Sequence, residues 1–214
     1  MSNFILIDAG YYCFYRYFAI TAWFKFRAKH NDEIELPDKP IENQEFTDKF
    51  KKIFVAKLKE IPKKLKIKNP IIMVGKDCPQ SDIWRVKHFP TYKSQRSTDE
   101  GIGPFFRMVY KEKLFEEGGA NVVMSHPHLE ADDCIAITCS QILSNVTDSK
   151  ITIIASDHDY SQLASDKISI FTLTYKNLLD SKTLFDDSQK NLFLKIVTGD
   201  KSDNIPGLFK KCGI

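Results

Sequence analysis

Five short apolar runs along the chain predict buried strands. Each run is rich in isoleucine, valine or leucine and is bounded by polar or turn-forming residues, which is typical of strands covered on both faces. These runs are residues 4–7, 71–74, 121–124, 151–155 and 168–173.

Several segments between these runs show the spacing of helices. In residues 47–65, Phe50, Phe54, Leu58 and Ile61 recur every three or four positions, which predicts an amphipathic helix. Further helices are expected at 11–26, 129–143 and 192–197, whereas 30–45 and 75–103 are expected to be irregular. Strands that alternate with helices predict an α/β fold with a mostly parallel central sheet and helices on both faces.

Composition agrees with one such domain. The chain has 214 residues, of which 43% are hydrophobic and 28% charged, and no apolar run is long enough to span a bilayer. The first residues lack the pattern of a signal peptide, and five scattered cysteines show no disulfide or zinc-ligand spacing. We therefore expect a single domain over residues 1–214, with reduced thiols, in the cytoplasm.

The charge distribution is more informative than the net charge of +3. Residues 57–68 and 85–96 are strongly basic, whereas acidic residues gather just after the predicted strands. A basic run of this kind is either the solvated face of a helix or a surface for a polyanion.

Carboxylates follow four of the five predicted strands. In a doubly wound sheet the carboxyl ends of the strands meet at one edge, where ligands bind. Crowded carboxylates repel one another unless cations lie among them, and oxygen ligands suit Mg²⁺ or Mn²⁺. Two such ions about 4 Å apart suit displacement at phosphorus. The residues concerned are Asp8, Asp77, Glu130, Asp132, Asp133, Asp157, Asp159, Asp200 and Asp203.

Each carboxylate taken alone has a structural explanation as a helix cap or a turn residue. The whole set is harder to explain in this way, because caps have no reason to recur as doubled acids after successive strands. Other chemistries fit less well: the sequence has no P-loop, no GxSxG nucleophile motif and no histidine pair at zinc-binding spacing.

Three ordered motifs resemble those of the 5′ nuclease superfamily. This family includes flap endonucleases, the 5′ exonuclease domain of bacterial DNA polymerase I and phage 5′ nucleases such as the RNase H of T-even phages. The motifs are Leu-Glu-Ala-Asp-Asp at 129–133, Ser-Asp-His-Asp-Tyr-Ser-Gln-Leu at 156–163 and Gly-Asp-Lys-Ser-Asp-Asn-Ile-Pro-Gly at 199–207. A fourth stretch resembles the T-even phage pattern, with Asp77, Trp84-Arg85 and Tyr92-Lys93-x-x-Arg96.

The resemblance implies ligands for two metal ions. Asp8, Asp77, Glu130 and Asp132 correspond to ligands of the first ion. The second ion is expected near Asp157, Asp159, Asp200 and Asp203, with Asp132 or Asp133 between the two.

The resemblance also implies positively charged groups opposite the metals. Lys93 and Arg96 correspond to catalytic basic residues that hold the scissile phosphate, and Tyr92 is expected to stack on an unpaired base. Further contacts with nucleic acid are expected from Arg16, Arg85, Arg107, Lys111 and Lys113.

Residues 94–120 correspond to the family's helical arch, and residues 199–214 to the start of a helix–hairpin–helix element that grips duplex DNA. The expected function is a 5′→3′ exonuclease and flap endonuclease that acts on DNA and RNA:DNA hybrids and removes RNA primers in phage replication. We expect a monomer that works with replication proteins. A PIN-type single-strand endoribonuclease and a non-catalytic nucleic-acid-binding module are the alternatives.

Overall fold

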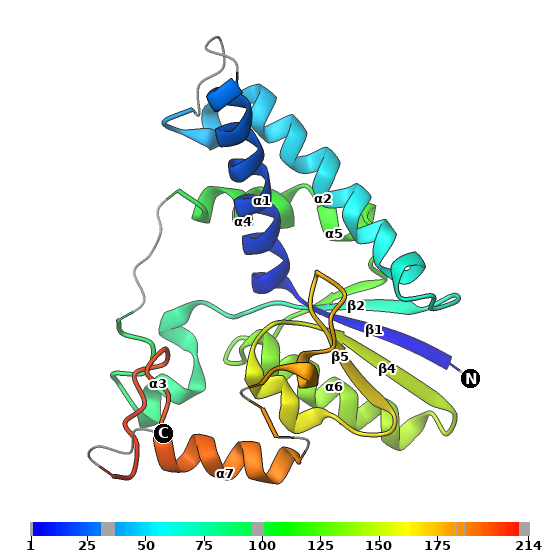
Figure 1. Ribbon diagram of the computed structural model, residues 1–214, viewed down its shortest axis with the longest axis vertical. Helices are drawn as coiled ribbons and strands as arrows, with labels where there is room; N and C mark the ends of the chain where they lie inside the picture. The colour runs from blue at the N-terminus through cyan, green and yellow to red at the C-terminus, as the bar shows by residue number, and fades with distance from the viewer. Residues whose placement is uncertain (1, 31–36, 96–100, 183, 186, 210–214) are drawn as a thin grey trace.

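The computed structural model, which describes residues 2–30, 37–95, 101–182, 184–185 and 187–209, has a five-stranded sheet at its centre (Figure 1). The strand order is β3-β2-β1-β4-β5, and every described pairing of these strands is parallel. The strands are β1 (Ser2–Asp8), β2 (Ile71–Gly75), β3 (Val122–Met124), β4 (Ser149–Ile154) and β5 (Ile168–Phe171). All five lie where the apolar runs predicted them.

The central strand β1 is buried on both faces. Its side chains alternate between two hydrophobic clusters, with Ile5 and Ile7 in one and Phe4 and Leu6 in the other. This alternation explains why β1 appears in the sequence as a continuous apolar run.

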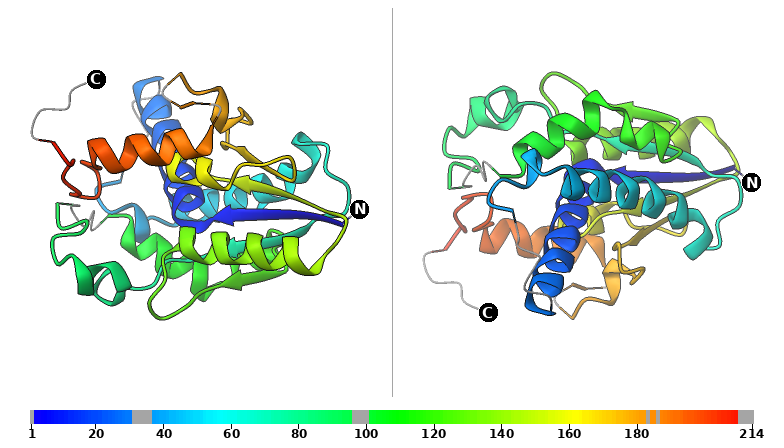
Figure 2. Two further views of the ribbon diagram at one scale, coloured as in Figure 1. Left: turned by 90° about the horizontal axis from the view of Figure 1, so that it is seen from below. Right: turned by 90° about the horizontal axis from the view of Figure 1, so that it is seen from above.

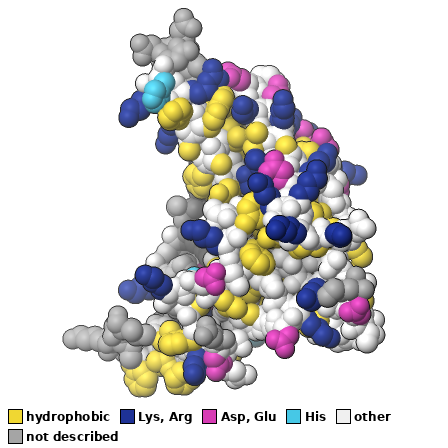
Figure 3. Space-filling view, turned by 45° about the vertical axis from the view of Figure 1, so that its right-hand side comes forward, with side chains coloured by type: hydrophobic (Ala, Val, Ile, Leu, Met, Phe, Trp, Pro, Cys, Tyr) yellow, Lys and Arg dark blue, Asp and Glu magenta, His cyan; other side chains and the backbone are white. Residues whose placement is uncertain are grey.

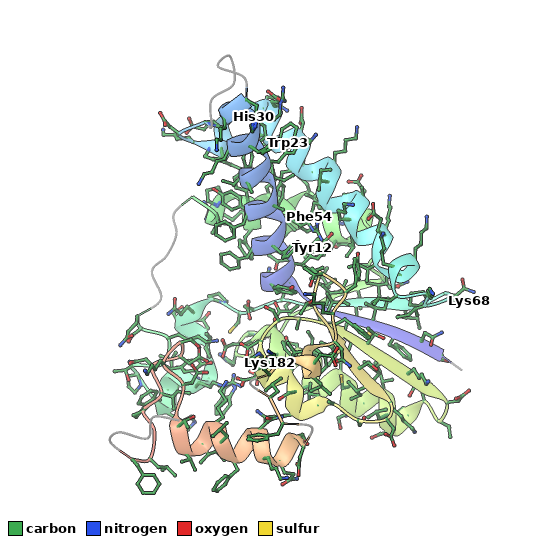
Figure 4. All side chains as sticks on the ribbon, viewed as in Figure 1. Tyr12, Trp23, His30, Phe54, Lys68 and Lys182 are labelled. Atoms are coloured by element: carbon green, nitrogen blue, oxygen red, sulfur yellow. The ribbon has the colours of Figure 1, made fainter. Side chains whose placement is uncertain are left out.

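An aromatic layer covers the first face of the sheet. It is carried by α1 (Ala9–His30), α2 (Gln44–Lys64), α4 (Gly103–Lys111) and α5 (Leu114–Glu117). Tyr12 of α1 meets Phe54 of α2 edge to face, with ring centroids 4.8 Å apart, and its hydroxyl donates to the Phe54 carbonyl (Figure 4). The ring of Phe115 packs against both residues. The predicted aromatic helix after the first strand is therefore confirmed, and most of its tyrosines belong to the core.

The second face is covered by α6 (Ala131–Asn145), which lies on the opposite side of the sheet from α2 (Figure 2). The 3₁₀ segment η3 (His158–Leu163) joins this cluster through Tyr160, and α7 (Ser188–Thr198) packs against η3. The fold is thus the predicted parallel sheet with helices on both faces.

Two segments differ from the expected irregular chain. The basic stretch after β2 contains η2 (Gln80–Asp82) and the short helix α3 (Trp84–His88), and a further 3₁₀ turn, η1 (Pro40–Glu42), precedes α2. The helix α3 is too short to show helical periodicity, so only its packing reveals it. A last 3₁₀ turn, η4, spans Leu178–Asp180.

The surface agrees with several features of the composition. Exposed lysines on α2 and the turn after it give that side of the molecule a basic surface, as Figure 3 shows. No helix within the described ranges is long and apolar enough to cross a bilayer. Cys13, Cys78, Cys134 and Cys139 are buried free thiols, whereas Cys212 lies outside the described residues.

Candidate functional site

The strand register brings the acidic segments to one edge of the sheet. Asp8 at the end of β1 is paired with Gly75 at the end of β2, and Gly75 is also paired with Met124 of β3. On the other side of β1, Ile7 is paired with Ile154 of β4. The segments that carry the acids therefore all leave the sheet at the same edge. This is the edge predicted from the strand-end positions, at the point where the strand order reverses.

Asp8, Asp77 and Asp132, here named the inner acids, lie at this edge at the end of β1, in the loop after β2 and in the first turn of α6. The Asp8 Oδ1 atom accepts from the Tyr11 amide at 2.8 Å and its Oδ2 atom from the Tyr160 hydroxyl at 2.9 Å. The Asp77 Oδ1 atom accepts from the Ala131 amide at 2.8 Å, which ties the loop after β2 to the start of α6. Each bond fixes a carboxylate while leaving further oxygen lone pairs available.

Gly10 leaves space between two of these carboxylates. A β-carbon at this position would lie 3.3 Å from Asp77 Oδ2 and 3.4 Å from Asp8 Oδ1. Asp8 and Asp77 thus lie on either side of the same point, so Asp77, chosen from its spacing to Trp84 and Arg85, joins Asp8 at the site.

The charges of Asp8 and Asp132 are poorly compensated. Burial, together with the neighbouring carboxylates Asp77 and Asp157, raises the pKa of Asp8 to about 6. Burial and the charge of Glu130 raise the pKa of Asp132 to about 6 as well, despite the nearby Arg85. Buried carboxylate oxygens that lack a countercharge are the environment that a hard divalent cation offsets. The residues present therefore fit a Mg²⁺ or Mn²⁺ ion.

A second group, Glu130, Asp133 and Asp203, is named the Glu130 cluster. One carboxylate oxygen from each of Glu130, Asp132 and Asp133 lies within 4.8 Å of the others, a spacing that also suits a metal ion. Lys93 places its ammonium 2.5 Å from Glu130 Oε1 and 3.8 Å from Asp203 Oδ2. The predicted cationic group thus faces the acids.

The backbone of Lys93 is fixed by a hydrogen bond to the loop after α7. Its φ of 53° is in the left-handed region, and its amide donates to the Asp203 carbonyl at 2.9 Å. Asn204 donates to the Thr91 carbonyl in the same contact. The loop that carries Lys93 and the loop after α7 are therefore fastened together, although they are more than 100 positions apart in sequence.

Tyr92 has a different position from the one expected. It is only 5% exposed, and its hydroxyl donates to Glu130 Oε2 at 2.9 Å and to Asp203 Oδ2 at 3.2 Å. The expectation that its ring stacks on an unpaired base is corrected, because the ring is packed against Cys78 and Ile83. Tyr92 positions two carboxylates instead.

Arg85 is also turned inward rather than toward a nucleic acid. Its guanidinium forms two bonds to Asp133, of 2.7 and 2.8 Å, and one of 2.9 Å to Glu130. Burial opposes the charge of Asp133, yet hydrogen bonds from Arg85 hold the pKa of Asp133 below its usual value. Arg85 holds α3 on the start of α6, and these ion pairs argue against its expected contact with nucleic acid.

Asp159 and Asp200, named the outer acids, lie on the other side of the site and share a lysine. Lys195 of α7 is bonded to Asp159 and lies 2.8 Å from Asp200 Oδ2. Burial opposes ionisation of Asp200, but hydrogen bonds from Lys195 and Ser202 lower the pKa of Asp200 to about 2. Burial raises the pKa of Asp159, a shift that Lys195 reduces.

The segment Gly199–Gly207 has a fixed shape that supports these positions. Gly199 has a φ of 73°, and a β-carbon there would lie 2.4 Å from Gly207 N and from Ile205 O. An isolated bridge joins Asp200 to Ile205, and Asp203 accepts from the Tyr92 hydroxyl at 3.2 Å. Asp203 was expected with Asp200 around the second ion. Its amide donates to Asp200 Oδ1 at 3.3 Å, but its own carboxylate accepts from the Tyr92 hydroxyl on the side of Glu130. Asp157 starts η3, and its side chain accepts from the Asp159 amide at 3.0 Å.

The remaining predicted contacts divide into three cases. Arg16 is 6% exposed, with its guanidinium over the rings of Tyr12 and Tyr15, so the expectation that it contacts nucleic acid is corrected by its burial. Three residues are exposed, and their role stays a prediction: Arg107, Lys111 and Lys113. Arg96 lies outside the described residues.

The predicted arch at 94–120 is only partly described. Its helices α4 and α5 are anchored in the aromatic core by Phe105 and Phe115. Residues 96–100, and with them the connection to Lys93, lie outside the described ranges.

Sequence reasoning missed two side chains at the site, Tyr160 and Lys195. Tyr160 is inside the second motif, but its bond to Asp8 crosses 152 positions and leaves no local signal. Lys195 has a weak signal, since it lies about one and a half helical turns before Asp200 on a predicted helix.

Known proteins with similar sequences define the family. The family model described as the 5′-3′ exonuclease, N-terminal resolvase-like domain, matches residues 3–190. The chain is 32% identical over 138 residues to the 5′-3′ exonuclease of Bacillus subtilis (strain 168), covering 60% of this chain and 44% of that protein. It is 24% identical over 196 residues to the flap endonuclease of Escherichia phage T5, covering 86% of this chain and 61% of that one.

Solved structures with the same fold come from phage T5. The T5 D15 protein co-crystallised with metal ions aligns with a TM-score of 0.63 at 20% identity, over 98% of this chain and 70% of that chain. A pseudo-enzyme-product complex of the D15 flap endonuclease with DNA and metal ions aligns with a TM-score of 0.57 at 21% identity, over 98% and 71%. The chain spans less than two thirds of the length of both curated relatives. The match over residues 3–190, with acids gathered where the strands end, shows that this chain belongs to the 5′-3′ exonuclease family through its N-terminal resolvase-like domain.

Proposed function

We propose that this chain is a divalent-metal-dependent 5′ nuclease that hydrolyses phosphodiester bonds at 5′ ends and flaps. The observation that carries the proposal is the convergence of carboxylates from several strand ends on one edge, with the Lys93 ammonium beside them. Family membership and the metal-bound T5 structures of the same fold support it.

The inner acids and the Glu130 cluster would hold one Mg²⁺ or Mn²⁺ ion, and the outer acids with Asp157 a second. Such ions activate water and stabilise the leaving oxygen of the phosphodiester. Neighbouring side chains position the carboxylates for this role. Tyr160 and Tyr92 donate hydrogen bonds to Asp8 and Glu130, and Arg85 donates to Asp133. Lys93 is the proposed contact for the scissile phosphate, because its ammonium reaches the acids from the opposite loop.

DNA is the proposed polymer, in keeping with the DNA complex of the T5 flap endonuclease. RNA:DNA hybrids, removal of RNA primers in phage replication, contact with replication proteins, action as a monomer and a location in the cytoplasm are further parts of the proposal.

Cleavage of three 5′-labelled substrates tests the proposal: a flap, a nicked duplex and an RNA:DNA hybrid. We expect cleavage with Mg²⁺ and none with excess EDTA. Absence of cleavage on all three substrates with Mg²⁺ or Mn²⁺ would contradict the proposed function. Preferential cutting of single-stranded RNA would favour the PIN-type endoribonuclease instead.

A further inference from the structure

Lys195 lies where a divalent ion of the outer acids would bind. Its ammonium contacts both Asp159 and Asp200, which come from η3 and from the loop after α7. The side chain is 30% exposed and starts from a helix that packs directly on η3. The three charged groups therefore form one compact unit built from η3, α7 and the loop after α7.

A cavity of about 460 Å³ opens beside this unit and is lined by Asp157, Asp159, Lys195 and Asp200. It is large enough for a hydrated cation, and its acidic lining would attract one. The lysine therefore shares with an incoming ion both the space and the ligands.

The inner acids offer a contrast within the same site. The structure describes no ion pair for Asp8 or Asp132, whereas Asp200 is neutralised by a group of the protein itself. An ion at Asp8 and Asp132 would displace no ammonium from these two carboxylates, although Glu130 beside them is paired with Lys93 and Arg85. An ion at the outer acids would have to displace an ammonium first.

We propose that Lys195 is a built-in counter-cation that competes with the second divalent ion for Asp159 and Asp200. This inference rests on the proposed function, because it assumes that the acids bind metal. It implies ordered binding, with a tight ion at the inner acids and a weaker ion at the outer acids. In the absence of metal, Lys195 keeps η3 and the loop after α7 together by balancing their charges.

Titration with Mn²⁺ tests the competition, with binding followed by calorimetry. Lys195→Met removes the charge and keeps much of the side-chain volume, whereas Lys195→Arg keeps the charge. Lys190→Met is the matched control, because Lys190 is an exposed lysine on the same helix.

We expect one tight and one weak Mn²⁺ site in the unchanged protein and in Lys190→Met. In Lys195→Met the weak site should become tighter by at least about tenfold, because a repelling charge a few ångströms away is removed. In Lys195→Arg it should stay weak. A second site of equal affinity in Lys195→Met and in the unchanged protein would overturn the inference.

A measurement on the unchanged protein applies even where Lys195→Met does not fold. Acylation of individual lysines by an amine reagent, followed by mass spectrometry, reports how free each ammonium is. We expect saturating Mn²⁺ to accelerate acylation of Lys195 and to leave Lys190 unaffected. A Lys195 rate that Mn²⁺ does not change would overturn the inference, whereas failure of the protein to bind any Mn²⁺ would overturn the proposed function itself.

Discussion

The inner acids and the outer acids are both crowded carboxylates, yet they are neutralised in different ways. Asp8 and Asp132 have a pKa raised to about 6, because burial and neighbouring acids oppose their charge. Of the outer acids, Asp200 has a pKa lowered to about 2, since Lys195 and Ser202 donate to it against the effect of burial. Burial keeps the pKa of Asp159 raised, a shift that the same lysine reduces. Carboxylates without a positive partner in the protein, such as Asp8 and Asp132, are where a metal ion is needed to balance charge. At Asp200 a metal ion would have to compete with the ammonium of Lys195.

The largest expected effects come from removing one carboxylate charge, either from the inner acids or from the outer acids. Asp132→Asn should lower flap cleavage by about a thousandfold or more, because it removes a proposed metal ligand. The same change should stabilise the metal-free protein by about 1 to 2 kcal/mol at neutral pH, since it removes a buried charge whose pKa is raised.

Asp200→Asn is the matched variant on the other side. It should also reduce cleavage, but it should destabilise the metal-free protein by about 1 kcal/mol after allowance for solvent screening, because Lys195 loses a partner. Cleavage rates and melting in EDTA measure both effects. Equal stability changes of the same sign would show that the two groups of acids do not differ.

The next effect concerns Lys93. Lys93→Ala should slow cleavage by about a hundredfold while DNA affinity falls much less, because the ammonium acts mainly on developing phosphate charge. Single-turnover cleavage and equilibrium binding in Ca²⁺ separate the two effects. Lys87→Ala is the control, since Lys87 is exposed on α3 and lies six positions earlier. A parallel loss of rate and affinity would make Lys93 a binding residue only.

The stability of the metal-free protein should depend on pH. Asp8 and Asp132 have a folded pKa of about 6 against an ordinary 3.8, so the folded state binds more protons between these values. The stability contributed by these two groups is therefore fully present below this window and falls as pH rises through it, by roughly 2 to 5 kcal/mol in total. Asp133 and Asp200, whose pKa values are lowered, act at lower pH.

Denaturant unfolding in EDTA at about pH 5 and about pH 7.5 measures the upper part of this fall, roughly 1 to 2 kcal/mol. Saturating Mg²⁺ should stabilise the protein much more at the higher pH. If the stability in EDTA instead rises with pH, the ionised inner acids do not destabilise the folded protein.

The smallest effect is expected for Arg85→Lys. Lysine cannot reproduce the two parallel bonds to Asp133, so stability should fall by about 1 kcal/mol. Because Arg85 faces the acids, the affinity for DNA and its salt dependence should stay unchanged. A reduced salt dependence of DNA binding would restore Arg85 as a phosphate contact.

A helix-cap role and the proposed metal-ligand role do not exclude each other at this site. Asp8 accepts from the Tyr11 amide, Asp133 from the Glu130 amide and Asp157 from the Asp159 amide, as ordinary caps do. The same carboxylates lie at the edge where the strands end. The explanation as helix caps is therefore confirmed for these three residues, and it leaves the proposed metal ligation open to them.

The sequence by itself determined the five parallel strands, the helical segments on both faces and the edge at which the acids gather. These features depend on local periodicity and on the register of buried strands, both of which are properties of short segments. Only the tertiary structure decided the partners of each charge. Arg16 and Tyr92 are buried, Arg85 turns inward, and Lys195 reaches the outer acids, since a long or aromatic side chain takes its direction from elements far away in sequence.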